Sequence, residues 1–268
     1  MTGLLAHWSA HWSTYWSTYQ RQLPALAYAA WLRLTVQFAR TVIGSGWIGL
    51  SSLLSVAVLG TIYGTITRVN DWPAYWVYVA LGLVSWSTLA GSITGSCTLM
   101  ERARERLLNQ PLPLGVVVLE EWLTTVFGLV MALSLLLVVI GLVDPVVWLR
   151  LLQGGWLGLL NLLLGCLWLS LLVSPLAVAV ADLPQLVPIL LQIGFLASPI
   201  LFYRQSLGAL AWVTRLNPLY GWVRLARDPF LGTVHWGAQL GVLVVQLLLV
   251  LVLLAWIDRR RMAVIRWL

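Results

Sequence analysis

The sequence predicts an all-α membrane protein in which six transmembrane helices follow N-terminal interfacial helices, with short re-entrant helices between the fifth and sixth spans. Composition is the first reason: 60% of the residues are apolar and 9% are charged, whereas about 25% are charged in a typical soluble domain. The second is charge spacing, because the charges separate uncharged stretches of about 20 residues or more, the length that crosses a bilayer. These observations exclude a soluble enzyme, a disordered tail and a coiled coil.

The N-terminal unit, residues 1–41, combines an aromatic segment with an amphipathic helix. The aromatic segment is a four-residue repeat, HWSA-HWST-YWST, which on a helix aligns Trp8, Trp12 and Trp16 in one row. Tryptophan favours the membrane–water boundary, so the repeat indicates a helix lying in that interface. The amphipathic stretch at 25–41 leads directly into the first span.

The same repeat places His7 and His11 four residues apart, a spacing that suits two metal ligands on one helical face. No acidic residue or third ligand accompanies them, so we predict no metal site here. Cys97 and Cys166 lie far apart in apolar stretches without ligand spacing, which indicates two small core residues.

The second unit, residues 42–268, holds the six predicted spans. The stretch between Arg150 and Tyr203 is too long for one helix, and its one ionisable residue, Asp182, precedes Leu183-Pro184. Because proline disfavours a helical residue before it, we expect two spans joined by a tight turn at 181–184. The predicted spans are 41–67, 75–99, 116–143, the pair within 150–203, and 234–257.

The distribution of arginine predicts the orientation, because cytoplasmic loops carry an excess of basic residues. With the N-terminus inside, ten arginines lie on the cytoplasmic side and six on the other, which favours cytoplasmic N- and C-termini. Glu120, Glu121 and Asp182 then lie near the cytoplasmic surface. We interpret them as boundary acids that helix N-termini and arginine partners stabilise.

Two segments are neither spans nor plain loops. Residues 100–112 form a short charged helix that ends at Pro111-Leu112-Pro113, a rigid elbow suited to receiving force from a partner. The outer loop at 204–230 is too apolar for water and too short to span, so two short amphipathic helices lying re-entrant or in the interface are expected.

The sequence also limits the chemistry. It contains no lysine, so it can hold neither a Walker A phosphate loop nor a Schiff-base lysine, and any ATP hydrolysis must occur on another subunit. Its three histidines form no H-E-x-x-H motif, and no acid pair lies at mid-membrane depth, so a membrane-embedded transferase is disfavoured. The net charge of +7 is an inside-biased set of arginines and not a nucleic-acid footprint.

Several short motifs, in this order and spacing, resemble the permease subunits of ABC-2 type exporters for O-antigen and other cell-surface polysaccharides. The likeness extends over nearly the whole chain after about residue 25. The motifs are RTVIG at 40–44, YVALGLVSW at 78–86, QPLP at 110–113, DLPQLVP at 182–188, SPI at 198–200 and LNPL at 216–219. Ala181 stands where the family usually carries arginine, and the N-terminal aromatic repeat is not a family feature.

The resemblance implies a permease homodimer on two ABC ATPase subunits in the bacterial inner membrane, with ATP and magnesium on those subunits and no cofactor on this chain. It implies a glycan substrate on an undecaprenyl pyrophosphate carrier. Residues 25–41 would be the interface helix, 100–112 the coupling helix and 204–230 the outer gate helices. ABC-2 export of another substrate (teichoic acid, capsule or a drug) and a non-transporting assembly subunit are the alternatives.

Candidate site residues follow from this reading. Guanidinium groups match phosphate oxygens, so Arg33 and Arg40 at the inner surface are candidates for the carrier diphosphate, with snorkelling to lipid phosphates as the competing explanation. The outer arginines 204, 215, 224 and 227 are weaker candidates. Aromatic rings stack on sugars, although many of them pack or contact lipid. The candidates for glycan contact are Trp47, Tyr63, Trp76, Trp86, Trp122 and Trp168; those for ATPase coupling are Glu101, Arg102, Arg104, Glu105, Arg106 and Leu108; those for the gate are Ser198, Pro199, Asn217 and Pro218.

Overall fold

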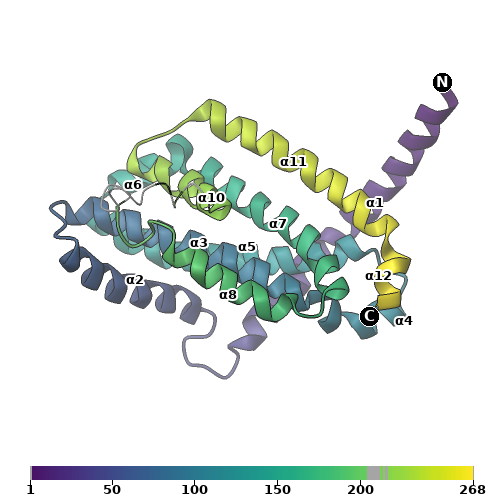
Figure 1. Ribbon diagram of the computed structural model, residues 1–268, viewed down its shortest axis with the longest axis horizontal. Coiled ribbons are helices and arrows are strands. Elements are labelled where there is room, and N and C mark those ends of the chain that lie inside the picture. Colours follow the sequence, from purple (N-terminus) through teal and green to yellow (C-terminus); the bar gives the residue numbers. More distant parts are fainter. Residues whose placement is uncertain (1, 204–211, 213, 215–216, 268) are drawn as a thin grey trace.

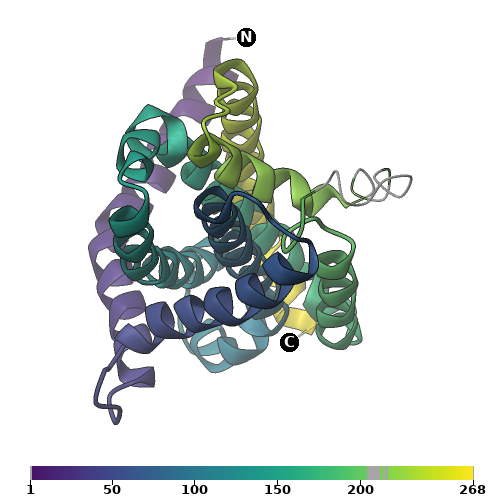
Figure 2. The same cartoon turned by 90° about the vertical axis from the view of Figure 1, so that its left-hand side faces the viewer.

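The computed structural model describes residues 2–203, 212, 214 and 217–267, with side chains from residue 19 onward, and every regular element in these residues is a helix. Five stretches are long and apolar enough to cross a membrane. They run side by side along the long axis of the molecule (Figure 1), and Figure 2 views them from one end. These stretches are α2 (Gly46–Ile66), α3 (Trp72–Arg102), α5 (Leu114–Val143), α6 to α7 (Val146–Ala179) and α11 (Trp236–Arg259).

These five stretches coincide with five of the six predicted spans. The exception is α8 (Leu183–Leu196), whose 14 residues measure about 21 Å at 1.5 Å per residue, against about 30 Å of hydrocarbon. The chain leaves the helix at Ala197 and continues through Pro199 to Tyr203 without regular helical structure. The full-length helix predicted here is therefore a short helix with an irregular tail, because an apolar sequence does not reveal where its helix ends.

The fourth span is kinked near its start. The short helix α6 (Val146–Arg150) passes through the π-turn η1 (Leu151–Gly155) into α7 (Trp156–Ala179). Gly154 has φ +151°, a conformation that favours glycine, and its missing side chain makes room for Val234, which lies 2.9 Å from the position of a Cβ atom. The kink thus brings the start of α11 against the start of α7.

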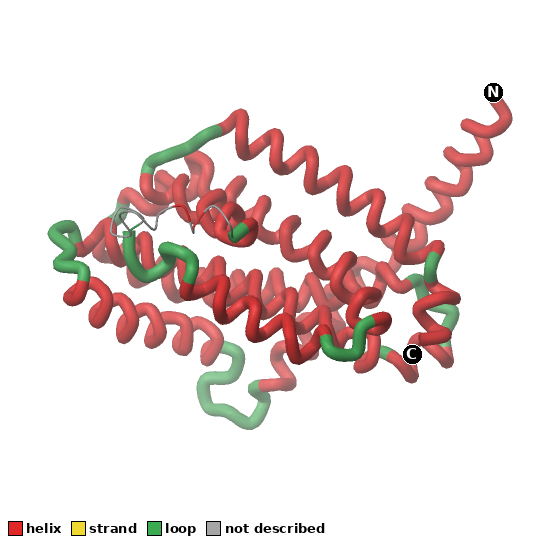
Figure 3. The backbone as a smooth tube through the Cα atoms, in the orientation of Figure 1, coloured by secondary structure: helices red, strands yellow, loops and turns green. Residues whose placement is uncertain are grey.

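Short helices close the two ends of the bundle, and Figure 3 shows most of the loops gathered there. We name the ends after α6 and α4 (Arg104–Asn109). The α4 end also carries α12 (Arg261–Trp267). The half nearer α6 carries α10 (Pro218–Arg227) and the 3-10 turn η3 (Asp228–Leu231).

The N-terminal unit is one continuous helix, α1 (Thr2–Gln37), which includes Pro24 and extends beyond the bundle (Figure 1). The sequence predicted two segments here, and the structure joins their backbones. Tyr19 and Leu26 pack with Val116 at the start of α5, so the second half of α1 is attached to the bundle. The side chains of the tryptophan repeat lie outside the described residues.

The centre of the core is α3, which packs against α2, α5, α7, α8 and α10. Leu81 and Leu89 of this helix are fully buried, and they pack with Leu136 of α5 and Leu162 of α7 in the main hydrophobic cluster. By contrast, α2 and α11 expose most of their surfaces, as helices facing lipid or a partner do.

Candidate functional site

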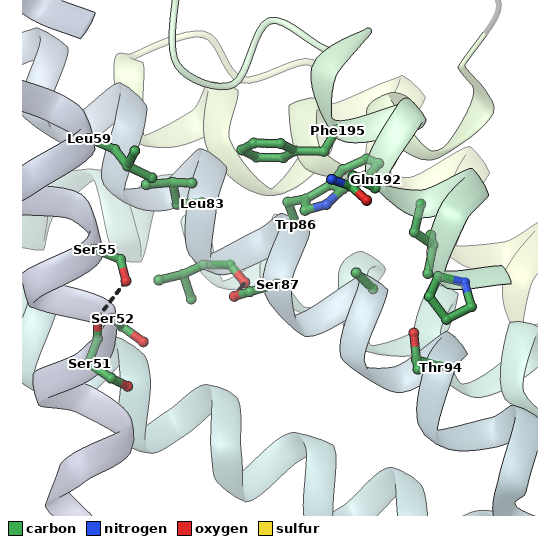
Figure 4. A pocket seen from close by; sticks show the side chains of 14 residues that line it. Ser51, Ser52, Ser55, Leu59, Leu83, Trp86, Ser87, Thr94, Gln192 and Phe195 are labelled. Atoms are coloured by element: carbon green, nitrogen blue, oxygen red, sulfur yellow. Dashed lines mark hydrogen bonds between the residues drawn. The ribbon is translucent and has the colours of Figure 1, made fainter. Parts of the chain in front are cut away.

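An open groove of about 570 Å³ lies between α2 and α8, with α3 as its floor (Figure 4). None of its fourteen lining residues is charged. The polar lining residues are Ser51, Ser52 and Ser55 of α2, Ser87 and Thr94 of α3, and Gln192 of α8.

The groove serines present hydrogen-bond acceptors. Ser52 and Ser55 each donate their hydroxyl proton to a carbonyl oxygen four residues earlier, at 2.9 and 2.8 Å, and Ser87 donates to the Val84 carbonyl at 3.0 Å. A hydroxyl that donates in this way keeps acceptor lone pairs. The Gln192 amide adds both donors and an acceptor on the opposite wall. The groove therefore suits an uncharged, hydroxyl-rich chain.

Trp86 and Phe195 form the aromatic part of the groove. Their ring centroids lie 5.9 Å apart, and Gly194 leaves room for the indole, whose nearest atom lies 3.2 Å from the position of a Cβ. Trp86 is largely buried, with only 6% of its surface exposed, so the ring is held in place by packing. The indole therefore offers little surface on which a sugar could stack, and the partly buried Phe195 is the more accessible of the two rings.

The other aromatic residues predicted to contact a glycan lie outside the groove. Trp47 is exposed on α2, and Tyr63 packs with Tyr75 and Tyr78 near the α6 end. The Trp76 ring packs over Gly60, where the nearest ring atom is 2.5 Å from the position of a Cβ. The remaining two contact α7 and α10: the Trp122 indole donates to the Leu163 carbonyl at 2.7 Å, and Trp168 lies 5.7 Å from the Trp222 ring.

At the α4 end, two glutamates at the start of α5 collect arginines from three other elements. Glu120 pairs with Arg33 of α1 and Arg106 of α4. Glu121 pairs with Arg33 at 2.9 Å and with Arg102 of α3 at 3.1 Å. The arginine partners expected for Glu120 and Glu121 are therefore present, whereas Asp182 lies exposed in the turn before α8.

The ion-pair cluster distinguishes the two arginines that were predicted to bind the carrier diphosphate. Arg33, a candidate for the carrier diphosphate, uses both terminal nitrogens of its guanidinium on glutamates, although 45% of its side chain stays exposed. Arg40 lies exposed in the loop between α1 and α2, outside the cluster. Three arginines meet two glutamates, so the cluster keeps one excess positive charge.

The elbow has an inner and an outer face. Arg106 joins the ion-pair cluster, Arg102 donates to the Gly95 carbonyl at 2.8 Å as well as to Glu121, and Leu107 is completely buried. The outer face consists of the remaining predicted coupling residues, all exposed: Glu101, Arg104, Glu105 and Leu108. The six-residue helix α4 is thus packed against the bundle on one side and exposed on the other.

The predicted gate residues lie together. The Asn217 amide donates to the Ser198 hydroxyl at 2.7 Å and to the Gly194 carbonyl at 2.9 Å, while its side-chain oxygen caps α10 by accepting from the Leu219 amide. Pro199 and Pro218 stand beside these two residues. Much of the predicted gate, at 204–211, 213 and 215–216, lies outside the described residues; α10 covers 218–227.

Sequence reasoning treated Arg227 only as one of four outer arginines, yet it joins three elements. Its guanidinium lies 3.7 Å from the centroid of the Tyr78 ring and donates to the Pro199 carbonyl and the Tyr220 hydroxyl, both at 3.1 Å. Only 3% of the residue is exposed. The position of Asp228, beside Arg224 and Arg227, was a local signal that an ion pair forms here.

A second group that the sequence reasoning missed is a set of amides between α7 and α11. Asn161 is fully buried and donates to the Gln239 carbonyl at 3.2 Å, and the Gln246 amide donates to the Asn161 oxygen at 3.4 Å. Gln239 and Gln246 are seven residues apart on one face of α11. That spacing, in an otherwise apolar span, was the available signal.

Among the described residues, His, Cys, Asp and Glu nowhere gather in a group of three or more that suits a metal ion. The site is therefore built from an uncharged groove, a partly neutralised arginine cluster and an elbow with one open face. Comparison of the chain with known protein families and with curated proteins finds no match.

Proposed function

We propose that the chain is the permease subunit of an ABC exporter that moves a lipid-linked polysaccharide across the bacterial inner membrane, driven by a separate ATPase subunit. The substrate we propose is an O-antigen or similar glycan on undecaprenyl pyrophosphate. The observation that carries this proposal is the groove: it is uncharged, and its lining combines six hydroxyl or amide side chains with eight apolar ones. Such a lining forms hydrogen bonds with a sugar chain. Because it carries no charge, it does not hold that chain through ion pairs.

The open side of the groove supports a homodimer. Apolar side chains flank it on α2 and α8, including Leu54 at 52%, Val58 at 57%, Ile189 at 55% and Ile193 at 58% exposure. A single chain leaves the hydroxyls and the amide of the groove open to lipid, which offers them no further hydrogen bonds. Two chains that face each other through α2 and α8 would enclose the grooves in one path.

We further propose that Leu183–Tyr203 is the remaining span, the fifth in chain order. Pro188 lines the groove with Thr94, and the Tyr75 hydroxyl donates to the Leu201 carbonyl at 2.7 Å. Between Thr94 and Tyr75, α3 rises about 29 Å at 1.5 Å per residue, so α8 and its tail follow α3 across nearly the whole bilayer. The irregular tail is shielded by α3 and α10, as membrane-depth backbone outside a helix requires.

The contacts of α10 support its assignment as a re-entrant gate helix. Asn217 at its start bonds the Gly194 carbonyl, and Trp222 covers Gly165, ten residues into α7. The helix then returns toward the α6 end, where Arg227 holds the tail of α8 through the Pro199 carbonyl. The gate in this proposal opens when the contacts between α10 and the tail of α8 separate.

The α4 end would face the cytoplasm, and the outer face of α4 would dock on the ATPase. Leu108, which is 55% exposed on a charged helix, is the apolar anchor for that contact. Arg40 is the freer of the two candidates for the carrier diphosphate, because Arg33 is engaged with Glu120 and Glu121. The permease itself binds no cofactor in this proposal; ATP and magnesium belong to the partner.

Deletion of the gene tests the proposal. We expect the surface glycan to disappear and its lipid-linked form to accumulate inside, with recovery on complementation by the wild-type chain. Reversal of charge at Arg104 and Glu105, with Leu108→Asp, should abolish export without loss of folded protein. An unchanged surface glycan after deletion refutes the polysaccharide substrate; loss of another exported compound would identify an ABC-2 exporter of a different substrate. Retention of export by the elbow variant refutes the coupling assignment.

A further inference from the structure

The last residues of α11 and the first of α12 form hydrogen bonds on both sides of the turn that joins α4 to α5. The Asp258 carboxylate accepts from the Gly115 amide at 2.9 Å, at the start of α5. The Arg261 guanidinium donates to the Leu112 carbonyl at 2.9 Å and to the Gln110 carbonyl at 3.2 Å, just after the end of α4. The turn between α4 and α5 is thus held from both sides by residues about 150 positions later in the chain.

The chemistry of each contact fits the helix end that it meets. Helix N-termini leave amide groups without partners and favour a nearby acid, whereas C-termini leave carbonyl groups and favour a cation. Asp258 lies at the N-terminus of α5, and Arg261 also reaches the Leu107 carbonyl inside α4, at 3.4 Å. Pro111 and Pro113 carry no N–H, so the turn can supply few donors of its own.

Two further contacts bind these elements. Val264 of α12 is 3% exposed and packs in one cluster with Leu107 of α4 and Leu114 of α5, both fully buried. The Tyr19 hydroxyl of α1 donates to the Asp258 carboxylate at 2.5 Å. Burial raises the pKa of the Tyr19 phenol, which keeps the tyrosine a proton donor at this contact.

We infer that Asp258 and Arg261 are positioning residues that fix the angle of α4 relative to the last span, so that α4, α12 and the end of α11 move as one body. The statement that these elements move as one body, the mechanical part of the inference, depends only on the contacts described above. Its consequence for transport rests on the proposed function: a force received by α4 is transmitted to α11 as well as to α3 and α5.

Spin labels test the mechanical part in the full-length chain in lipid nanodiscs. Leu108 and Met262 are 55% and 65% exposed, so each can carry a label after Cys97 and Cys166, both buried, are replaced by alanine. We expect a narrow distance distribution that Arg261→Gln widens about twofold, because neutral glutamine loses the charge-assisted bonds. Arg261→Lys should restore part of it, since lysine keeps the charge but not the planar fork.

Arg266→Gln is the matched control, because it removes the same charge from the same helix and, within the described part of the chain, its guanidinium bonds the Met262 carbonyl of α12 and no residue of the elbow. We expect its distance distribution to equal that of the wild type. An Arg261→Gln distribution as narrow as the wild type overturns the inference. So does equal widening by Arg266→Gln, because the effect would then follow from charge and not from the contacts at the elbow.

Reconstitution of each variant with its partner ATPase tests the consequence. We expect Arg261→Gln to lower the amount exported per ATP hydrolysed, with Arg261→Lys intermediate and Arg266→Gln at the wild-type level. Normal coupling in Arg261→Gln, despite a widened distribution, refutes the role in force transmission. A wild-type chain that neither exports nor associates with an ATPase refutes the proposed function. The distance distributions still decide whether α4, α12 and the end of α11 move as one body.

Discussion

Replacement of Glu120 by glutamine tests how the α4 end is held together. The Glu120 side chain is 4% exposed, whereas its partners Arg33 and Arg106 are 45% and 39% exposed. Glutamine keeps nearly the same shape and one acceptor oxygen but loses the negative charge that both guanidinium groups share. Three arginines then remain with one glutamate, Glu121.

The expected loss of stability follows from these exposures. A hydrogen bond to a charged group contributes about 1.5–3 kcal/mol, and two such bonds are weakened. Both arginines can recover water after the change, and exposed ion pairs contribute about 0–1 kcal/mol, so we expect a total loss of about 1–2 kcal/mol. For a chain somewhat longer than 150–250 residues, each kcal/mol shifts Tm by about 2–4 °C, which predicts a fall of about 2–8 °C.

Tryptophan fluorescence during heating of the detergent-purified chain measures this fall, because the sequence contains 17 tryptophans. Glu101→Gln is the control, since it removes the same charge from an exposed position in the same region and should leave Tm unchanged. A fall in Glu120→Gln no larger than that of the control would show that the ion-pair cluster does not hold α1 and α4 to α5.

The other predictions concern the contacts of α10 and are measured by the same heating experiment. Gly158→Ala should lower Tm by several degrees, because a Cβ at this position would lie 2.3 Å from the Leu225 carbonyl oxygen and would push α7 and α10 apart. Gly91→Ala is the control and should leave Tm unchanged, because a Cβ there has nothing within 4 Å. Arg227→Gln should lower the free energy of unfolding by about 2–4 kcal/mol, because it removes a buried guanidinium that bonds the Pro199 carbonyl and the Tyr220 hydroxyl, whereas Arg224→Gln, at a half-exposed ion pair, should lower it by less than about 1 kcal/mol. Equal losses in Arg227→Gln and Arg224→Gln would contradict the buried role of Arg227.

The long helices were predictable because their ends are marked by charge. Arg102 ends α3, Asp144 follows α5 and Arg259 ends α11, so a count of uncharged residues locates each helix to within a few positions. The same count failed at α8, because the chain stays uncharged from Leu183 to Phe202 while its helix stops at Leu196. Hydropathy reports depth in a membrane and says little about backbone conformation.

The candidate site was less predictable, because it depends on which elements meet. Glu120 and Glu121 pointed to arginine partners, but the choice of Arg33, 87 and 88 positions away, follows only from the packing of α1 on α5. Trp86 was the one predicted glycan contact found in the groove. The serines of α2 became part of a site only when α8 placed Gln192 opposite them.

The groove between α2 and α8 is the central element of the proposed function, and obstructing it is the most direct test. Ser55→Trp places a large ring inside the groove, whereas Val252→Trp places the same ring on an exposed face of α11, away from the groove and from the proposed dimer contacts of α2 and α8. Surface glycan is then measured in cells that express either variant at equal levels in place of the wild type. We predict that Ser55→Trp loses the surface glycan and accumulates the lipid-linked form while Val252→Trp exports normally. Normal export by Ser55→Trp would contradict the proposed function.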